Sequence, residues 1–178
     1  MTRAVPDGGP IEAHTYLGKK LDYECELAVV LGKDARDVPA GQTRDYIFGY
    51  TILNDVSARD VQTAHKQWYF GKSLDGFTPI GPCIVTADAF ADYPPRLGIR
   101  SFVNGEKRQD SNTALQIFDI DHVVAELSQG MTLKAGTIIA TGTPAGVGMG
   151  MDPPQFLKPG DVVRCEIDGI GTLTNPVK

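Results

Sequence analysis

The chain has 178 residues, of which 42% are hydrophobic and 22% charged, and its formal net charge is −5. This predicts one globular domain, and the absence of any Lys/Arg cluster argues against a nucleic-acid-binding surface or a basic membrane-binding face. No apolar run approaches the ~18 residues of a membrane-spanning helix and no charged-then-apolar leader opens the chain, so we expect a soluble, cytoplasmic protein.

Residues 1–20 carry several Pro and Gly without periodicity and are expected to form an irregular lead-in, followed by a single domain at residues 21–178. The run Leu21–Leu31 has the length and composition of a strand. Glu24 and Glu26 are two apart in it, so their carboxylates project from the same face. A solvent-facing strand would accommodate this pair. A buried pair would need a positive partner, which a divalent cation supplies best.

A second strand, Tyr46–Leu53, leads directly to Asp55. If that strand end meets the first strand, three carboxylates converge, and such an oxygen-rich site selects Mg²⁺, Mn²⁺ or Ca²⁺ over zinc. Asp55 equally suits a helix cap or an Asx turn, which are common roles for such a residue. A helix is expected at Ala58–Trp68, with Ser57 as its cap. His65 on that helix could reach the same strand end, although a histidine in such a place is more often incidental.

Lys72 lies in Gly71-Lys72-Ser73, within a predicted loop that also contains Gly76 and Pro79. Its glycine, aromatic and proline neighbours are typical of a shaped loop rather than of an open surface. Facing a tricarboxylate metal centre, Lys72 would bind a substrate carboxylate or stabilise a developing enolate.

The rest of the chain is rich in strands, expected at Cys83–Thr86, Gly98–Val103, Glu106–Asp110, Thr137–Thr141, Asp161–Ile167 and Gly171–Thr174. Asn104-Gly105 is a strong hairpin signal, and Asp119 or Asp121 caps a helix that stops at Gly130. The glycine-rich segment Thr141–Gly148 lacks the Gly-Lys-Ser/Thr of nucleotide-binding loops, and it suits either a substrate-lining turn or a plain tight turn. We therefore predict a mainly β fold with a few short helices (α+β).

The three cysteines lie far apart in apolar, strand-like runs and form no CxxC pair. This pattern predicts reduced core thiols rather than a zinc or redox site. They are Cys25, Cys83 and Cys165.

Several segments, in order from Leu21 to the C-terminus, resemble motifs of the fumarylacetoacetate hydrolase family. They are Leu21–Val30 with its Glu-x-Glu pattern, Asn54–Asp60, Gln67-Trp68, Gly71–Ser73, Gly81-Pro82, Val103–Gly105 and Thr141–Gly148. The central motifs most resemble the bacterial branch of aromatic catabolism, which includes 2-hydroxyhepta-2,4-diene-1,7-dioate isomerases and acylpyruvate hydrolases.

The resemblance implies a mixed β-roll of the type found in that family's C-terminal domain, assembled as a homodimer. It implies Mg²⁺ or Mn²⁺ as the cofactor, with Ca²⁺ as a further option, and a small 2-oxo or β-diketo acid as the substrate. Lys72 matches the lysine beside the metal and is the expected catalytic residue. The positions that match the metal ligands are Glu24, Glu26 and Asp55. The positions that match the substrate pocket are Arg59, Gln62, Lys72 and Thr143.

The first implied activity is metal-dependent hydrolysis of a C–C bond in an acylpyruvate or β-diketo acid. The alternatives are an isomerase or decarboxylase of unsaturated 2-oxo dicarboxylic acids, and a metal-binding homologue with weak or no catalysis. The last alternative reflects a departure from the family pattern. Many family members carry a His/Glu pair in an upstream segment, but here 23 residues precede Glu24 and His14 falls in no matching motif. Either the pair is missing, another residue such as His65 or Lys72 replaces it, or the chain is truncated.

Overall fold

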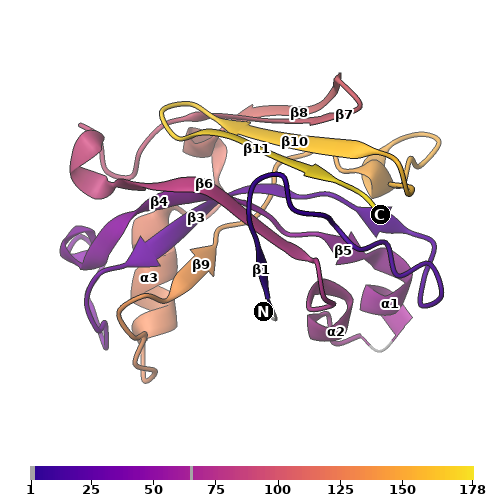
Figure 1. Ribbon diagram of the computed structural model, residues 1–178. Coiled ribbons are helices and arrows are strands. Elements are labelled where there is room, and N and C mark those ends of the chain that lie inside the picture. Colours follow the sequence, from indigo (N-terminus) through magenta and orange to yellow (C-terminus); the bar gives the residue numbers. More distant parts are fainter. Residues whose placement is uncertain (1–2, 65) are drawn as a thin grey trace.

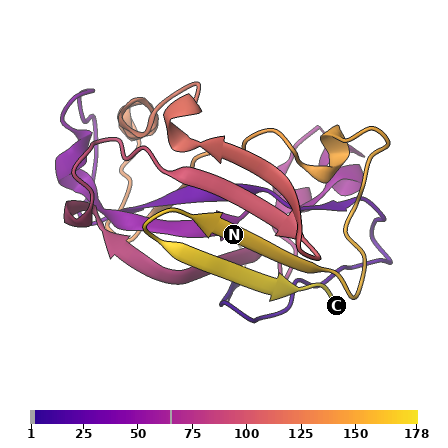
Figure 2. The same ribbon diagram turned by 90° about the horizontal axis from the view of Figure 1, so that it is seen from above.

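The computed structural model describes residues 3–64 and 66–178. In this part of the chain two β-sheets pack face to face (Figures 1 and 2). The first sheet has the order β1-β6-β4-β3-β9 and consists of β1 (Ala4–Val5), β6 (Thr78–Thr86), β4 (Ile47–Asn54), β3 (Cys25–Leu31) and β9 (Ile138–Ala140). The second has the order β11-β10-β7-β8 and consists of β11 (Gly171–Pro176), β10 (Val162–Ile167), β7 (Gly98–Val103) and β8 (Glu106–Asn112). A small pair, β2 (Leu21–Asp22) with β5 (Ser57–Ala58), lies beyond the start of β3.

Strand β3 lies at the centre of the molecule, between β4 and β9, and all seven of its residues are buried. Its apolar side chains share one core with residues of the opposite sheet, such as Val163 and Ile167. This burial on both sides explains why the segment is almost continuously apolar. The exception is Glu26, which is only 3% exposed.

The helical elements are short and lie around the sheets. They are α1 (Arg59–Ala64), α2 (Tyr69–Lys72), α3 (Ile120–Ser128) and the 3₁₀ turns η1 (Thr43–Tyr46), η2 (Ala87–Ala89), η3 (Thr113–Leu115) and η4 (Gly148–Gly150). Figure 1 shows α1 and α2 together beside β5, whereas α3 lies behind the strands. Within residues 3–64 and 66–178, the helices are too short and too polar to span a membrane. The predicted mainly β fold with few helices is confirmed.

Two local predictions are confirmed in detail. Asn104 and Gly105 both have positive φ, at 52° and 84°, and join β7 to β8 in the expected hairpin. The Asp119 side chain caps α3 by accepting a hydrogen bond of 2.8 Å from the His122 amide. Both features depend on a few consecutive residues, so the sequence was sufficient to predict them.

The helix predicted at Ala58–Trp68 is wrong in its extent, and Ser57 does not cap it. Ser57 and Ala58 form β5 and pair with β2, which keeps their backbone extended. The helical segment is divided into α1 and α2, and Lys66 between them has a φ of 57°. Gly71, expected in a loop, lies in α2, where an added Cβ would approach the Gln62 amide nitrogen to 2.5 Å. Its lack of a side chain therefore lets the two helices pack closely.

Three further expectations need correction. Cys83 is exposed rather than a core thiol, because the middle of β6 faces outward, whereas Cys25 and Cys165 are buried as predicted. The segment 1–20, expected to hold no regular element, contains β1, which pairs in parallel with the start of β6. Pro79, expected in a loop, lies in that part of β6.

Candidate active site

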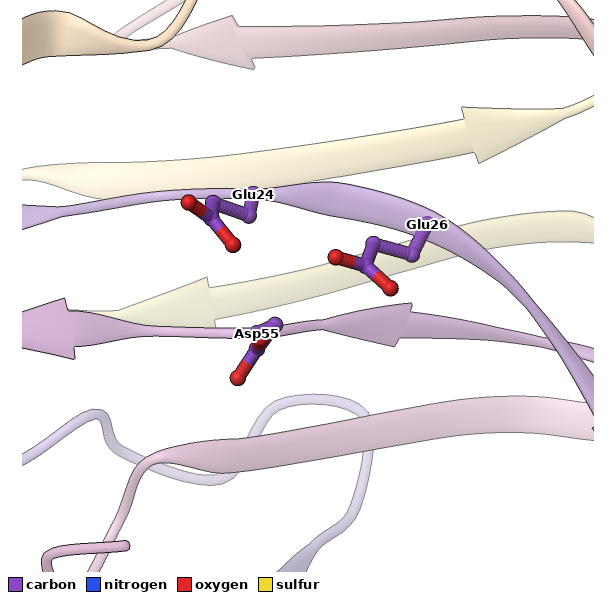
Figure 3. A group of neighbouring side chains, drawn as sticks. All are labelled: Glu24, Glu26 and Asp55. Atoms are coloured by element: carbon purple, nitrogen blue, oxygen red, sulfur yellow. The ribbon is translucent and has the colours of Figure 1, made fainter. Parts of the chain in front are cut away.

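Three carboxylates meet where the ends of neighbouring strands lie side by side. Glu24 lies between β2 and β3, Glu26 lies in β3, and Asp55 directly follows β4. One carboxylate oxygen from each residue lies within 4.8 Å of the others. Figure 3 shows Glu24 and Glu26 on the same side of the chain, with Asp55 beside them from the adjacent segment. The convergence predicted from the sequence is therefore present.

The antiparallel pairing of β3 with β4 sets this geometry. Cys25 is the partner of Asn54 in the ladder, so the residue after β4 arrives beside Glu24. The Asp55 amide donates to the Glu24 carbonyl at 2.9 Å, and the Glu24 amide donates to Asn54 Oδ1 at 2.9 Å. Because a side chain rather than a backbone carbonyl receives the Glu24 amide, the predicted strand Leu21–Leu31 is interrupted between β2 and β3.

Two cationic side chains contact the carboxylates. Lys72 Nζ donates to Glu24 Oε2 at 2.7 Å, to Asp55 Oδ2 at 2.6 Å and to Ser57 Oγ at 3.0 Å. On the other side of Glu24, Arg59 Nη1 lies 2.6 Å from Oε1. These charge-assisted contacts fix Glu24 between an ammonium and a guanidinium group.

The pKa values show how the charges are balanced. Burial, reinforced by the charge of Asp55, raises the pKa of Glu26 to about 8. Burial also raises the pKa of Asp55, although the hydrogen bond from Lys72 opposes the rise. For Lys72, burial favours a lower pKa, but the hydrogen bonds and charges of Asp55 and Glu24 prevail and raise it. Lys72 is therefore held as an ammonium, and Glu26 binds its proton more tightly than an exposed glutamate does.

A hard divalent cation fits this donor set. Such ions take carboxylate oxygens as ligands, and the charge of the ion offsets the repulsion that raises the pKa of Glu26. Glu24, Glu26 and Asp55 offer one oxygen each within the 4.8 Å group, which suits an ion that keeps further positions for water and substrate.

The three carboxylates line a cleft of about 480 Å³. Each residue that the sequence placed in the substrate pocket lines it: Arg59, Gln62, Lys72 and Thr143. Arg59 Nη1 donates to Gln62 Oε1 at 3.2 Å, and the Thr143 hydroxyl donates to the Cys25 carbonyl at 2.9 Å. The structure thus brings these side chains together, whereas their contacts with a substrate stay a prediction.

The glycine-rich segment Thr141–Gly148 forms one wall of this cleft through Gly142 and Thr143. The Gly142 amide donates to Glu26 Oε2 at 2.9 Å, so it contacts a carboxylate of the protein itself. Further along, the Tyr23 hydroxyl donates to the Gly146 carbonyl at 2.8 Å. The loop is therefore hydrogen-bonded to Tyr23 and Glu26, in the same segment as two of the three carboxylates.

Replacing Gly146 with alanine is expected to destabilise the fold. Gly146 has a φ of +107°, and an added Cβ would lie 2.2 Å from the Arg108 carbonyl oxygen. Strain of this backbone type costs about 1–3 kcal/mol, and the clash adds to it. Urea unfolding measures the loss. Gly142→Ala is the matched control, because Gly142 has a φ of +95° but no atom within 4 Å of the added Cβ. An equal loss in both variants would show that the Arg108 contact is unimportant.

Several residues around the cleft were not among the predicted site residues. Trp68 and Met149 line it, and the Ser57 hydroxyl accepts a hydrogen bond from Lys72. Asp22 lies behind Arg59, fully buried, with Arg59 Nε 2.9 Å from its Oδ2. The alternation of acidic residues at Asp22, Glu24 and Glu26 was the signal that could have revealed it.

The histidines do not contribute to this cleft in the described part of the chain. His65, considered as a replacement for the upstream pair, lies outside the described residues. His14 lies elsewhere, with its Nε2 2.7 Å from the Asp75 carbonyl oxygen, and His122 lies in α3.

The sequence of this chain is similar to a known protein family and to named proteins. The sequence profile of the family described as "Fumarylacetoacetate (FAA) hydrolase C-terminal" matches residues 2–178. The "Oxaloacetate tautomerase YisK" of Bacillus subtilis is 48% identical over 170 residues, which are 96% of this chain and 56% of that protein. The chain therefore spans little more than half the length of this relative.

Two solved structures are also close. The "Fumarylacetoacetate hydrolase (EaFAH)" of Exiguobacterium antarcticum is 51% identical with a TM-score of 0.95, covering 98% of this chain and 62% of that one. The "2-hydroxyhepta-2,4-diene-1,7-dioate isomerase" of Mycobacterium marinum is 44% identical with a TM-score of 0.86, covering 98% and 64%. These similarities confirm the predicted mixed β-roll.

Proposed function

The chain belongs to the fumarylacetoacetate hydrolase family, and from this premise we propose that it catalyses the keto–enol isomerisation of a small 2-oxo dicarboxylic acid. A divalent cation, Mg²⁺ or Mn²⁺, would assist at the carboxylate cleft. The observation that carries this proposal is the position of two cationic side chains, Lys72 and Arg59, beside three convergent carboxylates. Such a cleft suits an anionic substrate that also ligates a cation.

The names of relatives favour isomerisation over the C–C hydrolysis that ranked first from the sequence. One relative is named an oxaloacetate tautomerase and another a 2-hydroxyhepta-2,4-diene-1,7-dioate isomerase. Hydrolysis is supported by the name of the Exiguobacterium structure and stays the second candidate. All of these proteins are longer than this chain, which covers 56–64% of their lengths.

The metal-binding residues would be Glu24, Glu26 and Asp55, which supply hard oxygen ligands. A bound cation would act as a Lewis acid that makes the proton next to the 2-oxo group more acidic. The cation choice between Mg²⁺, Mn²⁺ and Ca²⁺ depends on coordination number and rigidity, and we propose Mg²⁺ or Mn²⁺ because the family resemblance implies them.

Lys72 and Arg59 would act on the substrate directly. Lys72, held as an ammonium by Asp55 and Glu24, would donate a hydrogen bond to the oxygen on which enolate charge develops. Arg59 lies in the cleft wall next to Gln62, where its guanidinium group would orient a substrate carboxylate. In this scheme binding and charge stabilisation come from two different side chains.

The contacts of Lys72 bear on the choice of reaction. Keto–enol isomerisation takes a proton from the carbon next to the 2-oxo group, delivers one to the oxygen and shifts the double bond, with no carbon–carbon bond broken. Hydrolysis also needs a base that takes a proton from an attacking water. Lys72 Nζ donates to both Glu24 and Asp55, and a donor in this position suits enolate stabilisation better than water activation.

Solvent deuterium exchange tests this function. We expect the chain to accelerate exchange of the C3 protons of oxaloacetate and the decay of its enol absorbance when Mg²⁺ or Mn²⁺ is present. Pyruvate and CO₂ are measured in the same samples, and acylpyruvates are assayed in parallel. Metal-dependent exchange without product release supports the isomerase. Release of pyruvate from acylpyruvates would support the hydrolase, and CO₂ from oxaloacetate the decarboxylase. Metal binding without turnover on the whole panel would favour a weakly catalytic homologue.

A further inference from the structure

Asp22 is a fully buried carboxylate that does not line the cleft. It has no exposed surface, and its contacts are all donors. Arg59 Nε lies 2.9 Å from its Oδ2, the Met149 amide donates to the same oxygen at 2.9 Å, and the Gly148 amide donates to Oδ1 at 2.7 Å. The Tyr23 amide adds a contact of 3.0 Å to Oδ1. A charge buried this deeply persists only because four donors surround it.

These contacts link two walls of the cleft. Arg59 and Met149 both line it, from α1 and from η4, and Asp22 is the group that both contact from behind. Gly148 fits this arrangement closely, since an added Cβ would lie 2.9 Å from Asp22 Oδ1 and 2.0 Å from the Gln155 carbonyl oxygen. The Gly148–Met149 turn therefore packs closely against Asp22.

Asp22 also balances the charge of the site. Arg59 contacts Glu24, one of the three carboxylates, at 2.6 Å. An uncompensated guanidinium at that distance would reduce the negative charge available to a cation. With Asp22 included, four carboxylates face two cationic groups, Arg59 and Lys72, and the cluster carries two negative charges when all six are ionised. That sum matches a divalent ion.

We propose that Asp22 is a positioning residue, which holds Arg59 and the Gly148–Met149 turn in place and neutralises Arg59 so that Glu24 keeps its charge for the metal. For the orientation of a substrate by Arg59, this inference rests on the proposed function. For the metal it stands on the contacts of Asp22 and Arg59 alone.

Charge complementation provides the test. Asp22→Asn keeps the shape of the side chain but leaves Arg59 uncompensated beside Glu24. We expect calorimetric titration with Mn²⁺ to show an affinity about 10–100-fold lower, the usual effect of losing an outer-shell partner. Adding Arg59→Gln restores the two negative charges of the cluster, so the double variant is expected to bind Mn²⁺ within a few-fold of the original chain. A purely structural role predicts that the double variant binds as weakly as Asp22→Asn, or more weakly.

Steady-state kinetics then separate the metal from the substrate. At saturating metal, Asp22→Asn should mainly raise KM for the 2-oxo acid and change kcat less. In a chain that already carries Arg59→Gln, Asp22→Asn should have little further effect on KM. The matched control is Asp60→Asn, because Asp60 accepts the Lys19 amide but contacts neither Arg59 nor the cleft. Without any turnover in the original chain, the proposed function fails while the Mn²⁺ titrations still decide the role of Asp22.

Other outcomes are equally decisive. Unchanged Mn²⁺ affinity in Asp22→Asn would overturn the proposal. If Asp22→Asn does not fold, the double variant still tests it, because both members of the buried Asp22–Arg59 pair are then removed and Glu24 keeps Lys72 as its partner. A folded double variant that binds Mn²⁺ supports the proposal, and one that has lost the ion overturns it. Failure of both variants to fold would assign Asp22 to structure alone and overturn it as well.

Discussion

Replacement of Asp55 with alanine is expected to abolish metal binding while the chain stays folded. Asp55 supplies one of three carboxylates that converge within 4.8 Å, and the two that remain share one short segment of chain. Losing a ligand should exceed the 10–100-fold effect of losing an outer-shell partner, so we expect Mn²⁺ affinity to fall by more than about 100-fold. Calorimetric titration measures this directly.

The fold should tolerate this change because of where Asp55 lies. Its side chain is 22% exposed, and the backbone hydrogen bond from its amide to the Glu24 carbonyl does not depend on the side chain. Circular dichroism of the variant is the check. Asp55→Asn is the companion variant, since it keeps one oxygen but removes the charge. Its Mn²⁺ affinity should lie between that of the original chain and that of Asp55→Ala. Unchanged affinity in Asp55→Ala would contradict the assignment of Asp55 as a ligand.

Replacement of Lys72 with alanine is expected to have the opposite profile, with metal retained and turnover lost. Lys72 contacts Glu24 and Asp55, so its removal takes away a cation that competes for two of the ligands. Mn²⁺ should bind at least as tightly as in the original chain. Turnover should fall about 10²–10³-fold, as is usual when one donor to a developing oxyanion is removed.

The comparison of two lysines makes this prediction specific. Lys134 pairs with Asp34 at 2.7 Å on an exposed loop and does not line the cleft, so Lys134→Ala should retain both metal binding and turnover. The deuterium-exchange assay and the titration are run on both variants. Full activity in Lys72→Ala would rule out enolate stabilisation by this side chain. Loss of both metal and turnover would instead place Lys72 in the structure of the metal centre.

The local features of the fold followed from the sequence because short-range physics determines them. Asn104-Gly105 forms its turn since both positions need positive φ, and Asp119 caps α3 through an amide three residues away. The same applies to Glu24 and Glu26, whose spacing of two puts their carboxylates on one side. The convergence with Asp55 was a conditional prediction, which the register of β3 against β4 fulfils.

Long-range contacts explain the local predictions that were wrong. Ser57 does not cap a helix, because it lies in β5, which pairs with β2. Gly71 lies in a helix and not in a loop, because α2 packs closely against α1. Cys83 is exposed together with Pro82 and Ile84, where the register of β6 against β4 shifts, and its apolar neighbours alone did not indicate this.

The family resemblance, the mainly β fold and the three candidate carboxylates could be predicted from the order of the residues. The balance of their charges depends on contacts that form when the chain folds. Arg59 reaches Asp22 from 37 positions away, and the Gly148 amide reaches it from 126 positions away. Spacing along a chain predicts which side chains share a face, but it does not predict which distant groups desolvate and neutralise one another. That is decided when the sheets and loops pack, because the energy of a buried charge depends on every donor that surrounds it.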